Sequence, residues 1–375
     1  MATLHLTIDL PKITDNASRT LSICRPLGIE VIGVTKGVGG RPEVARAMIA
    51  GGVTMLGDSR LENIVRMQKA GIEVPMMLLR SPALSEVADC IARVDTSLNV
   101  DLDVLRALSS EASRTGKHHS VILMVDLDTG REGLQPKDVP GMCREVSGMK
   151  GLTLQGLGAY FAYNSEREFQ ATSLRRLIAL TKKIEEECGF KLPIISGGST
   201  NVFGNFMSEH KPMQCVNLST PRPESRGLLE VHPEPCSCTP PSKAGLRAVE
   251  RVNQLRIGTA ILLGISSSIG PRRIQGFHHD TFVLKAELIE LKKQDRLLGM
   301  LSLGQLDMAQ EFLFPVSPGV TIVQASSDHT LVDVTDMDPK PHVGDTLAFQ
   351  LGYYSLMRLM ASPYVCLEFR QEQRP

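Results

Sequence analysis

The chain has 375 residues, and its 41 basic and 41 acidic side chains give a formal net charge of zero. This balance leaves no basic surface of the kind that binds nucleic acid or an anionic membrane. The chain has no apolar run of the roughly 18 residues that span a membrane and no signal-peptide pattern at its start, so we expect a cytoplasmic protein. Its eight cysteines are scattered, which favours reduced thiols over a disulfide framework.

A predicted strand at 5–10 and a predicted helix at 14–27 begin the chain, and strand-like and helix-like segments then alternate from residue 31 to residue 263. The predicted strands are 31–35, 53–56, 74–79, 96–100, 121–126, 152–162, 193–196 and 255–263. The predicted helices between them are 42–50, 61–70, 83–92, 102–113, one around Cys143, and 166–187. Eight strands in this alternation predict an α/β fold with a closed (β/α)8 TIM barrel. No Gly-x-Gly-x-x-Gly motif follows the first strand, which disfavours an open dinucleotide-binding sheet.

The pattern changes after about residue 271. Strand candidates follow one another without long helices, which predicts a C-terminal antiparallel β domain. They are 281–291, 299–303, 321–325, 329–334, 345–351 and 363–369. We therefore expect a barrel domain at 11–270 and a β domain at 271–375, with the strand at 4–10 as a candidate member of the second. A proline-rich segment at about 205–252 interrupts the barrel and is expected to be either mobile or functional.

Lys36 follows the first barrel strand, in the segment VIGVTKGVGG. Polar residues just past parallel strands meet at the C-terminal mouth of a barrel, where a partly desolvated lysine becomes a nucleophile. The alternative is a lysine that leaves the strand for solvent. Further polar residues expected at the same mouth are Asp58, Arg60, Arg80, Asn99, Asp126, Arg131, Tyr160 and Arg256.

Two later segments suggest an anionic or planar ligand. SGGST (residues 196–200) places glycines and hydroxyls before a possible helix, which fits either a phosphate cradle or an ordinary turn. Arg256 interrupts the apolar strand LRIGTAILLG. A buried arginine needs a partner, and a planar ligand, a carboxylate or a structural ion pair would serve.

Asp328 and His329 form a short polar turn that is either an acid/base pair or simply exposed, and Tyr353 in LGYYSL has a similar ambiguity. A zinc site is disfavoured, and no metal is expected, because Cys-x-Cys without a second tight pair is poor ligand spacing. The residues considered for zinc are His210, Cys215, His232, Cys236 and Cys238.

Five segments occur in the order of the pyridoxal-phosphate enzymes of fold type III. They are Lys36 after the first strand, VDLDTGREGL, SGGST, LRIGTAILLG and SSDHTLVDVTD. Over nearly its whole length the chain resembles the alanine racemase superfamily, and it resembles the ornithine racemase branch more closely through GQLD, ASSDH and LGYY. The resemblance implies an isomerase that interconverts L- and D-amino acids, with a cationic one such as ornithine or lysine fitting the branch.

The resemblance also implies a role for each site residue. Lys36 would bind pyridoxal 5'-phosphate as an aldimine and act as the base on one face of the substrate α-carbon, and Arg256 would face the pyridine nitrogen. Tyr160 would stack on the ring, Arg131 would steady the substrate carboxylate, and the turn of Asp328 and His329 would reach the active site of a partner subunit in a homodimer. The phosphate would be held by Ser199, Thr200, Gly258, Thr259 and Tyr353.

The sequence departs from the alanine racemases at the second base. Those enzymes carry a tyrosine ahead of the segment that here reads MLSLGQLDM, but this chain has no tyrosine between Leu284 and Met300. The identity of the second base therefore stays open. Two alternative functions also remain: a non-catalytic pyridoxal-phosphate carrier, which the C-terminal β domain disfavours, and an aldolase or decarboxylase of the same fold.

Overall fold

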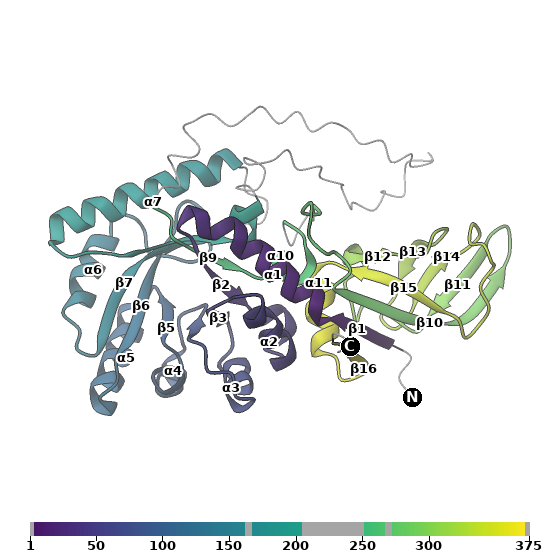
Figure 1. The fold of residues 1–375 in the computed structure, drawn as a ribbon, viewed down its shortest axis with the longest axis horizontal. Coiled ribbons are helices and arrows are strands. Elements are labelled where there is room, and N and C mark those ends of the chain that lie inside the picture. The colour runs from purple at the N-terminus through teal and green to yellow at the C-terminus, as the bar shows by residue number, and fades with distance from the viewer. Residues whose placement is uncertain (1–3, 162–166, 205–250, 267–271, 372–375) are drawn as a thin grey trace.

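A computed structural model describes residues 4–161, 167–204, 251–266 and 272–371. Two structural parts lie side by side: a parallel barrel ringed by helices, and an antiparallel sheet whose strands come mostly from the last hundred residues (Figure 1). The helix α1 (Leu10–Cys24) leads from one part to the other and packs against α2 and α10. No helix among the described residues is long and apolar enough to cross a membrane.

The barrel is closed by eight parallel strands, as the sequence predicts. Each strand pairs with the next, and the eighth pairs with the first. The strands are β2 (Glu30–Val34), β3 (Met55–Asp58), β4 (Met76–Leu78), β5 (Thr96–Asn99), β6 (His119–Val125), β7 (Leu152–Ala159), β8 (Ile194–Ser199) and β9 (Gln254–Ile257). The outer helices are α2 (Pro42–Ala50), α3 (Leu61–Lys69), α4 (Val87–Arg93), α5 (Leu102–Thr115), α6 (Val139–Ser147) and α7 (Arg167–Cys188).

Side chains alternate between the two faces of each barrel strand. A small apolar core formed by Ile32, Met77, Leu98, Ile122 and Met124 fills the inside, and the larger core lies between the strands and the helices. Alternation therefore decides which residue at a strand end faces the mouth of the barrel and which faces the helices.

The second part is an antiparallel sheet, which the sequence also predicts. Its central strand, β10 (Phe282–Lys293), pairs with β11 (Leu297–Leu301) and β15 (Thr346–Leu351). The remaining strands are β12 (Leu313–Pro315), β13 (Thr321–Ala325), β14 (Thr330–Asp333) and β16 (Val365–Arg370). The first strand of the chain, β1 (Leu4–Asp9), pairs antiparallel with β10 and parallel with β16.

Two local predictions need correction. The expected strand 255–263 ends at Ile257, and Thr259–Leu263 is instead the short helix α10. An apolar run does not by itself distinguish a buried strand from a buried helix, and Gly258 separates the two elements here. The helix α11 (Tyr353–Ala361) was not predicted either, although it packs against the turn that contains Lys36. The division into domains stays a prediction, and most of the proline-rich segment at 205–252 lies outside the described residues.

Candidate active site

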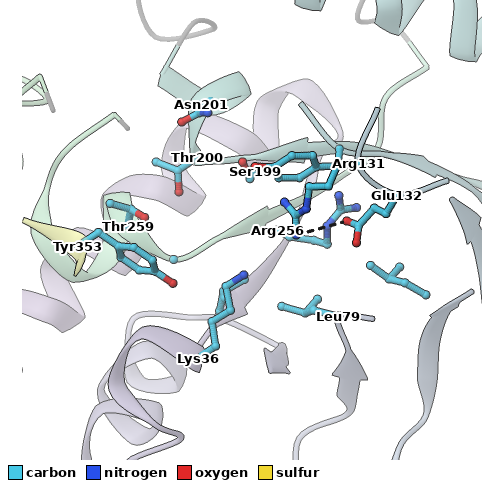
Figure 2. A pocket seen from close by; sticks show the side chains of 14 residues that line it. Lys36, Leu79, Arg131, Glu132, Ser199, Thr200, Asn201, Arg256, Thr259 and Tyr353 are labelled. Carbon is cyan, nitrogen blue, oxygen red and sulfur yellow. Dashed lines mark ion pairs between the residues drawn. The ribbon is translucent and has the colours of Figure 1, made fainter. Parts of the chain in front are cut away.

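A pocket of about 650 Å³, counted with its opening to solvent, lies at the C-terminal ends of the barrel strands. Three apolar residues line it, together with eleven other residues (Figure 2). The apolar ones are Val34, Leu79 and Leu98, and the others are Lys36, Arg131, Glu132, Tyr160, Ser199, Thr200, Asn201, Arg256, Gly258, Thr259 and Tyr353.

Lys36 projects into this pocket from a 3-10 turn (Lys36–Val38) that begins two residues after the end of β2. Within the described part of the chain, its Nζ has no hydrogen-bond or ion-pair partner. Burial lowers the pKa of the Lys36 amine, the positive charge of Arg131 lowers it further, and the carboxylates of Asp58 and Glu132 oppose the shift. An amine of this kind is a usable nucleophile and base.

Asp58 lies behind this turn rather than in the pocket. Its fully buried carboxylate accepts hydrogen bonds from Thr35 Oγ1 at 2.8 Å, Asn63 Nδ2 at 3.0 Å and the Arg60 amide at 3.0 Å. Burial raises the pKa of Asp58, although these hydrogen bonds act in the opposite direction. The carboxylate thus holds the residue before Lys36 in place.

The loop after β6 brings Arg131 and Glu132 to the pocket. Asp126 organises it, because its Oδ1 accepts hydrogen bonds from the Thr129 amide and hydroxyl, both at 2.8 Å, and from the Gly130 amide at 3.2 Å. The Arg131 guanidinium lies over the Tyr160 ring, 3.8 Å from its centroid. Arg131 Nη2 also lies 3.8 Å from Glu132 Oε1.

Arg256 forms the inner wall of the pocket. Its Nη1 donates to Ser196 Oγ, and its Nη2 donates to the Ala159 carbonyl at 2.8 Å. Burial lowers the pKa of Arg256 to about 10, with Glu132 opposing the shift and Arg131 adding to it. The guanidinium therefore stays charged at neutral pH, held by neutral acceptors rather than by a carboxylate.

Hydroxyl groups from four segments of the chain face these cations. Ser199 ends β8, Thr259 begins α10 and Tyr353 begins α11, while Thr200 begins a helical segment after β8. Figure 2 shows Thr200, Thr259 and Tyr353 on one side of Lys36 and Arg131 and Arg256 on the other, with Ser199 between the two groups. Three cations, one carboxylate and four hydroxyls suit a ligand that carries a phosphate or carboxylate group.

Nine predicted site residues therefore come together in one pocket, and two do not. Asp328 and His329 are exposed on the turn before β14, where the Ser326 amide donates to the His329 carbonyl at 2.8 Å. Neither lines the pocket of its own chain. Asp58, Arg80 and Asn99, which were expected at the mouth, are also absent from the lining.

Sequence reasoning missed Glu132 and Asn201 as lining residues. Glu132 directly follows Arg131, and Asn201 directly follows Thr200. Both preceding residues are predicted site residues, so their neighbours in the sequence are the further candidates that the sequence offers.

The absence of a metal stays a prediction. All five cysteine and histidine residues considered as zinc ligands lie in 205–250, outside the described residues. Elsewhere, in the part that the structure describes, His5, Cys366 and Glu368 bring potential ligand atoms within 4.8 Å of one another on β1 and β16. None of the three lines the pocket, and two of them are exposed.

Comparison with known proteins adds relatives of known activity. The model of the alanine racemase N-terminal domain matches residues 8–217. The lysine racemase of Thermotoga maritima is 29% identical, over 96% of this chain and 97% of its own length. The ornithine racemase of Acetoanaerobium sticklandii is 28% identical, over 96% of this chain and 98% of its own length.

Solved structures with the same fold are more distant in sequence. D-threonine aldolase from Filomicrobium marinum superposes with a TM-score of 0.72 at 14% identity, covering 96% of this chain and 91% of that one. Alanine racemase from Bartonella henselae, solved with covalently bound pyridoxal phosphate, has a TM-score of 0.69 at 14% identity and covers 99% of this chain and 100% of that one. At these identities the similarity establishes the fold alone.

Proposed function

Since the chain belongs to the alanine racemase family, we propose that it is a pyridoxal-phosphate-dependent amino-acid racemase whose substrate is a cationic amino acid such as lysine or ornithine. The observation that carries the proposal is Lys36, an amine with a lowered pKa and no partner among the described residues, at the centre of a cationic pocket. The two relatives named for these substrates match nearly the full length of the chain, which supports the choice of substrate.

The pocket residues fit the cofactor. We assign its phosphate to Ser199, Thr200, Thr259, the Tyr353 hydroxyl and the backbone around Gly258, which approaches β2 closely: a Cβ atom on Gly258 would lie 3.1 Å from Val34 O. Lys36 is the residue that would hold the cofactor covalently, and Arg256 and Tyr160 would contact its ring. Pyridoxal phosphate, when bound, withdraws electrons from the substrate α-carbon and so makes the α-proton removable.

Lys36 then handles the proton on one face of the α-carbon, because its Nζ reaches into the pocket and its lowered pKa favours the neutral, basic form. Arg256 keeps its own protons at neutral pH, so it supplies positive charge without acting as a general acid. Arg131, at the rim of the pocket, orients the substrate carboxylate.

The other face needs a second proton carrier. We assign it to the turn with Asp328 and His329, acting across the interface of a homodimer, because both side chains are exposed and lie outside the pocket of their own chain.

An aldolase is the second candidate, because D-threonine aldolase has the same fold. Racemisation is favoured because the full-length sequence similarity is to racemases, whereas similarity to the aldolase is limited to the fold. A non-catalytic carrier is disfavoured because the C-terminal part contributes Tyr353 to the pocket.

The test is an absorbance spectrum between 300 and 500 nm of wild type and Lys36→Ala, recorded after pyridoxal phosphate has been added and the unbound cofactor removed. We expect a visible band in the wild type that borohydride fixes onto Lys36, as located by peptide mapping, and no such band in the variant. No band in the wild type would overturn the proposal.

Chiral analysis after incubation with lysine, ornithine, alanine and threonine then separates the activities. A racemase erases optical activity without changing the mass, an aldolase releases an aldehyde and glycine from threonine, and a carrier changes nothing.

A further inference from the structure

Glu132 is the one acidic side chain among the described residues that line the pocket, where it faces three cations. It accepts no hydrogen bond from any described residue, and its ion-pair partner there, Arg131, lies 3.8 Å away. That separation exceeds hydrogen-bonding distance. A carboxylate in this position has unused capacity to bind a cation.

The backbone next to Glu132 is held in a fixed conformation. After Glu132 the chain turns back against β6: the Leu134 amide donates to the Met124 carbonyl at 2.8 Å, and the Asp126 amide donates to the Leu134 carbonyl at 2.9 Å. Gly133 between them has φ +128°, and a Cβ atom there would come within 2.2 Å of the Asp126 nitrogen. Only glycine fits this turn, so the backbone that directs Glu132 toward the pocket is set before any ligand arrives.

The rest of the lining suits an alkyl chain that ends in an ammonium group. Leu79 and Leu98 provide apolar surface in the pocket that Glu132 also lines. Without Glu132, the charged side chains among the described lining residues would be the three cations Lys36, Arg131 and Arg256, which repel a substrate ammonium. Glu132 also raises the pKa of both Lys36 and Arg256, so its negative charge acts across the pocket.

We propose that Glu132 binds the side-chain ammonium of the substrate, whose methylene groups lie against Leu79 and Leu98, and thereby selects diamino acids over neutral ones. This inference rests on the proposed racemase function. It assigns selectivity to a residue of the same chain as Lys36.

The test compares wild type with Glu132→Gln on substrate pairs that differ only in the terminal amine: lysine with norleucine, and ornithine with norvaline. We expect Glu132→Gln to lower kcat/KM for both diamino acids by about 10- to 100-fold, mainly through KM, and to leave or raise kcat/KM for the neutral partners. Equal losses on both members of a pair would overturn the proposal, because they would mean that Glu132 only balances the nearby arginines. No loss would overturn it as well.

A matched control is Asp128→Asn, which removes one negative charge from the same loop outside the pocket, where Asp128 pairs with Arg176. Asn tolerates the positive φ of this position, so the loop keeps its shape. We expect this variant to leave the preference between pair members unchanged.

Binding without turnover separates this inference from the proposed function. Calorimetric titration of the cofactor-loaded protein with α-methylornithine and α-methylnorvaline, which have no α-proton to lose, measures ammonium recognition alone. We expect Glu132→Gln to weaken only the first by about 10-fold or more. If the wild type racemises only neutral amino acids, the proposed role of Glu132 is wrong but the proposed racemase function stands. If the wild type binds α-methylornithine through Glu132 but racemises no amino acid, the racemase function is wrong but the role of Glu132 stands.

Discussion

Gly37 lies directly against Tyr353, so that a Cβ atom on Gly37 would come within 2.8 Å of the Tyr353 ring carbon Cε2. This contact joins the turn that contains Lys36 to helix α11 of the second structural part. It places the Tyr353 hydroxyl beside the pocket, where we assign it to the cofactor phosphate.

We expect Gly37→Ala to displace the Tyr353 ring and to weaken pyridoxal-phosphate binding, with a loss of about 1–3 kcal/mol in the free energy of unfolding from overpacking. Cofactor titration and urea unfolding measure the two effects. Gly37 has a negative φ, so alanine adds no backbone strain. In a Tyr353→Ala background, Gly37→Ala should not lower the free energy of unfolding any further. If it still does, the contact with Tyr353 is not the cause of the loss. Gly141→Ala, in open space on α6, is the control.

The pKa of Lys36 should respond in opposite directions to two neighbouring charges. Arg131→Gln removes a charge that lowers this pKa, and Asp58→Asn removes one that raises it. Cyanate carbamylates neutral amines, so we expect labelling of Lys36 in the cofactor-free protein to need higher pH in Arg131→Gln and lower pH in Asp58→Asn than in wild type. Mass spectrometry of the Lys36 peptide follows the reaction, with exposed Lys137 as the internal standard. Shifts in the same direction would contradict the electrostatic explanation.

The loop that carries Arg131 and Glu132 should depend on Asp126. Burial raises the pKa of Asp126, but the hydrogen bonds from Thr129 and Gly130 outweigh it, so the pKa is lowered. The stabilisation is therefore complete above the ordinary value of about 3.9 and is lost as the pH falls through the lower folded value. At pH 7 we expect Asp126→Ala to cost about 1.5–3 kcal/mol and to speed hydrogen exchange in residues 127–134. Asp138→Ala, whose side chain caps no helix amide, should leave exchange in this loop unchanged.

His119 should make the barrel sensitive to mild acid. Its buried ring contacts Ser97 Oγ at 2.7 Å and the Val94 carbonyl at 3.0 Å. Burial lowers the pKa of His119, against the effects of Val94 and Asp95. The unfolded chain thus binds a proton more readily, and stability falls as the pH drops below about 6.5.

We expect the urea midpoint of wild type to fall between pH 7.5 and pH 5.5, and to fall less in His119→Gln. His118→Gln, a change at the exposed neighbouring residue, should keep the wild-type pH dependence. An identical pH dependence in wild type and His119→Gln would show that another group is responsible.

The sequence predicts the position of a site residue where a general rule of the fold applies to a whole strand or helix. Lys36 and Arg256 could be placed at one site because the C-terminal ends of parallel barrel strands meet, wherever they stand in the chain. The same rule failed for Asp58 and Asn99, because a shift of one residue along a strand turns a side chain from the mouth toward the helices. Strand boundaries predicted to within one or two residues do not determine that parity.

Other parts of the site depend on contacts between distant segments. Tyr353 reaches the pocket because it begins helix α11, whereas the sequence predicted only strands in this part of the chain. Thr259 begins helix α10, whereas the sequence predicted a continuous strand there. Glu132 has no distinguishing pattern of its own; its chemical meaning comes from the cations that the fold brings around it.

The position of β1 has a consequence for synthesis of the protein. Its buried Leu4, Leu6 and Ile8 are synthesised long before their partners on β10 and β16, because the whole barrel lies between them in the chain. The barrel strands can all be synthesised and paired before the partner strands of β1 exist. Contacts between residues so far apart in the chain also form slowly. A nascent or truncated chain that stops before β10 therefore exposes an unpaired strand, a natural site for chaperone binding or aggregation.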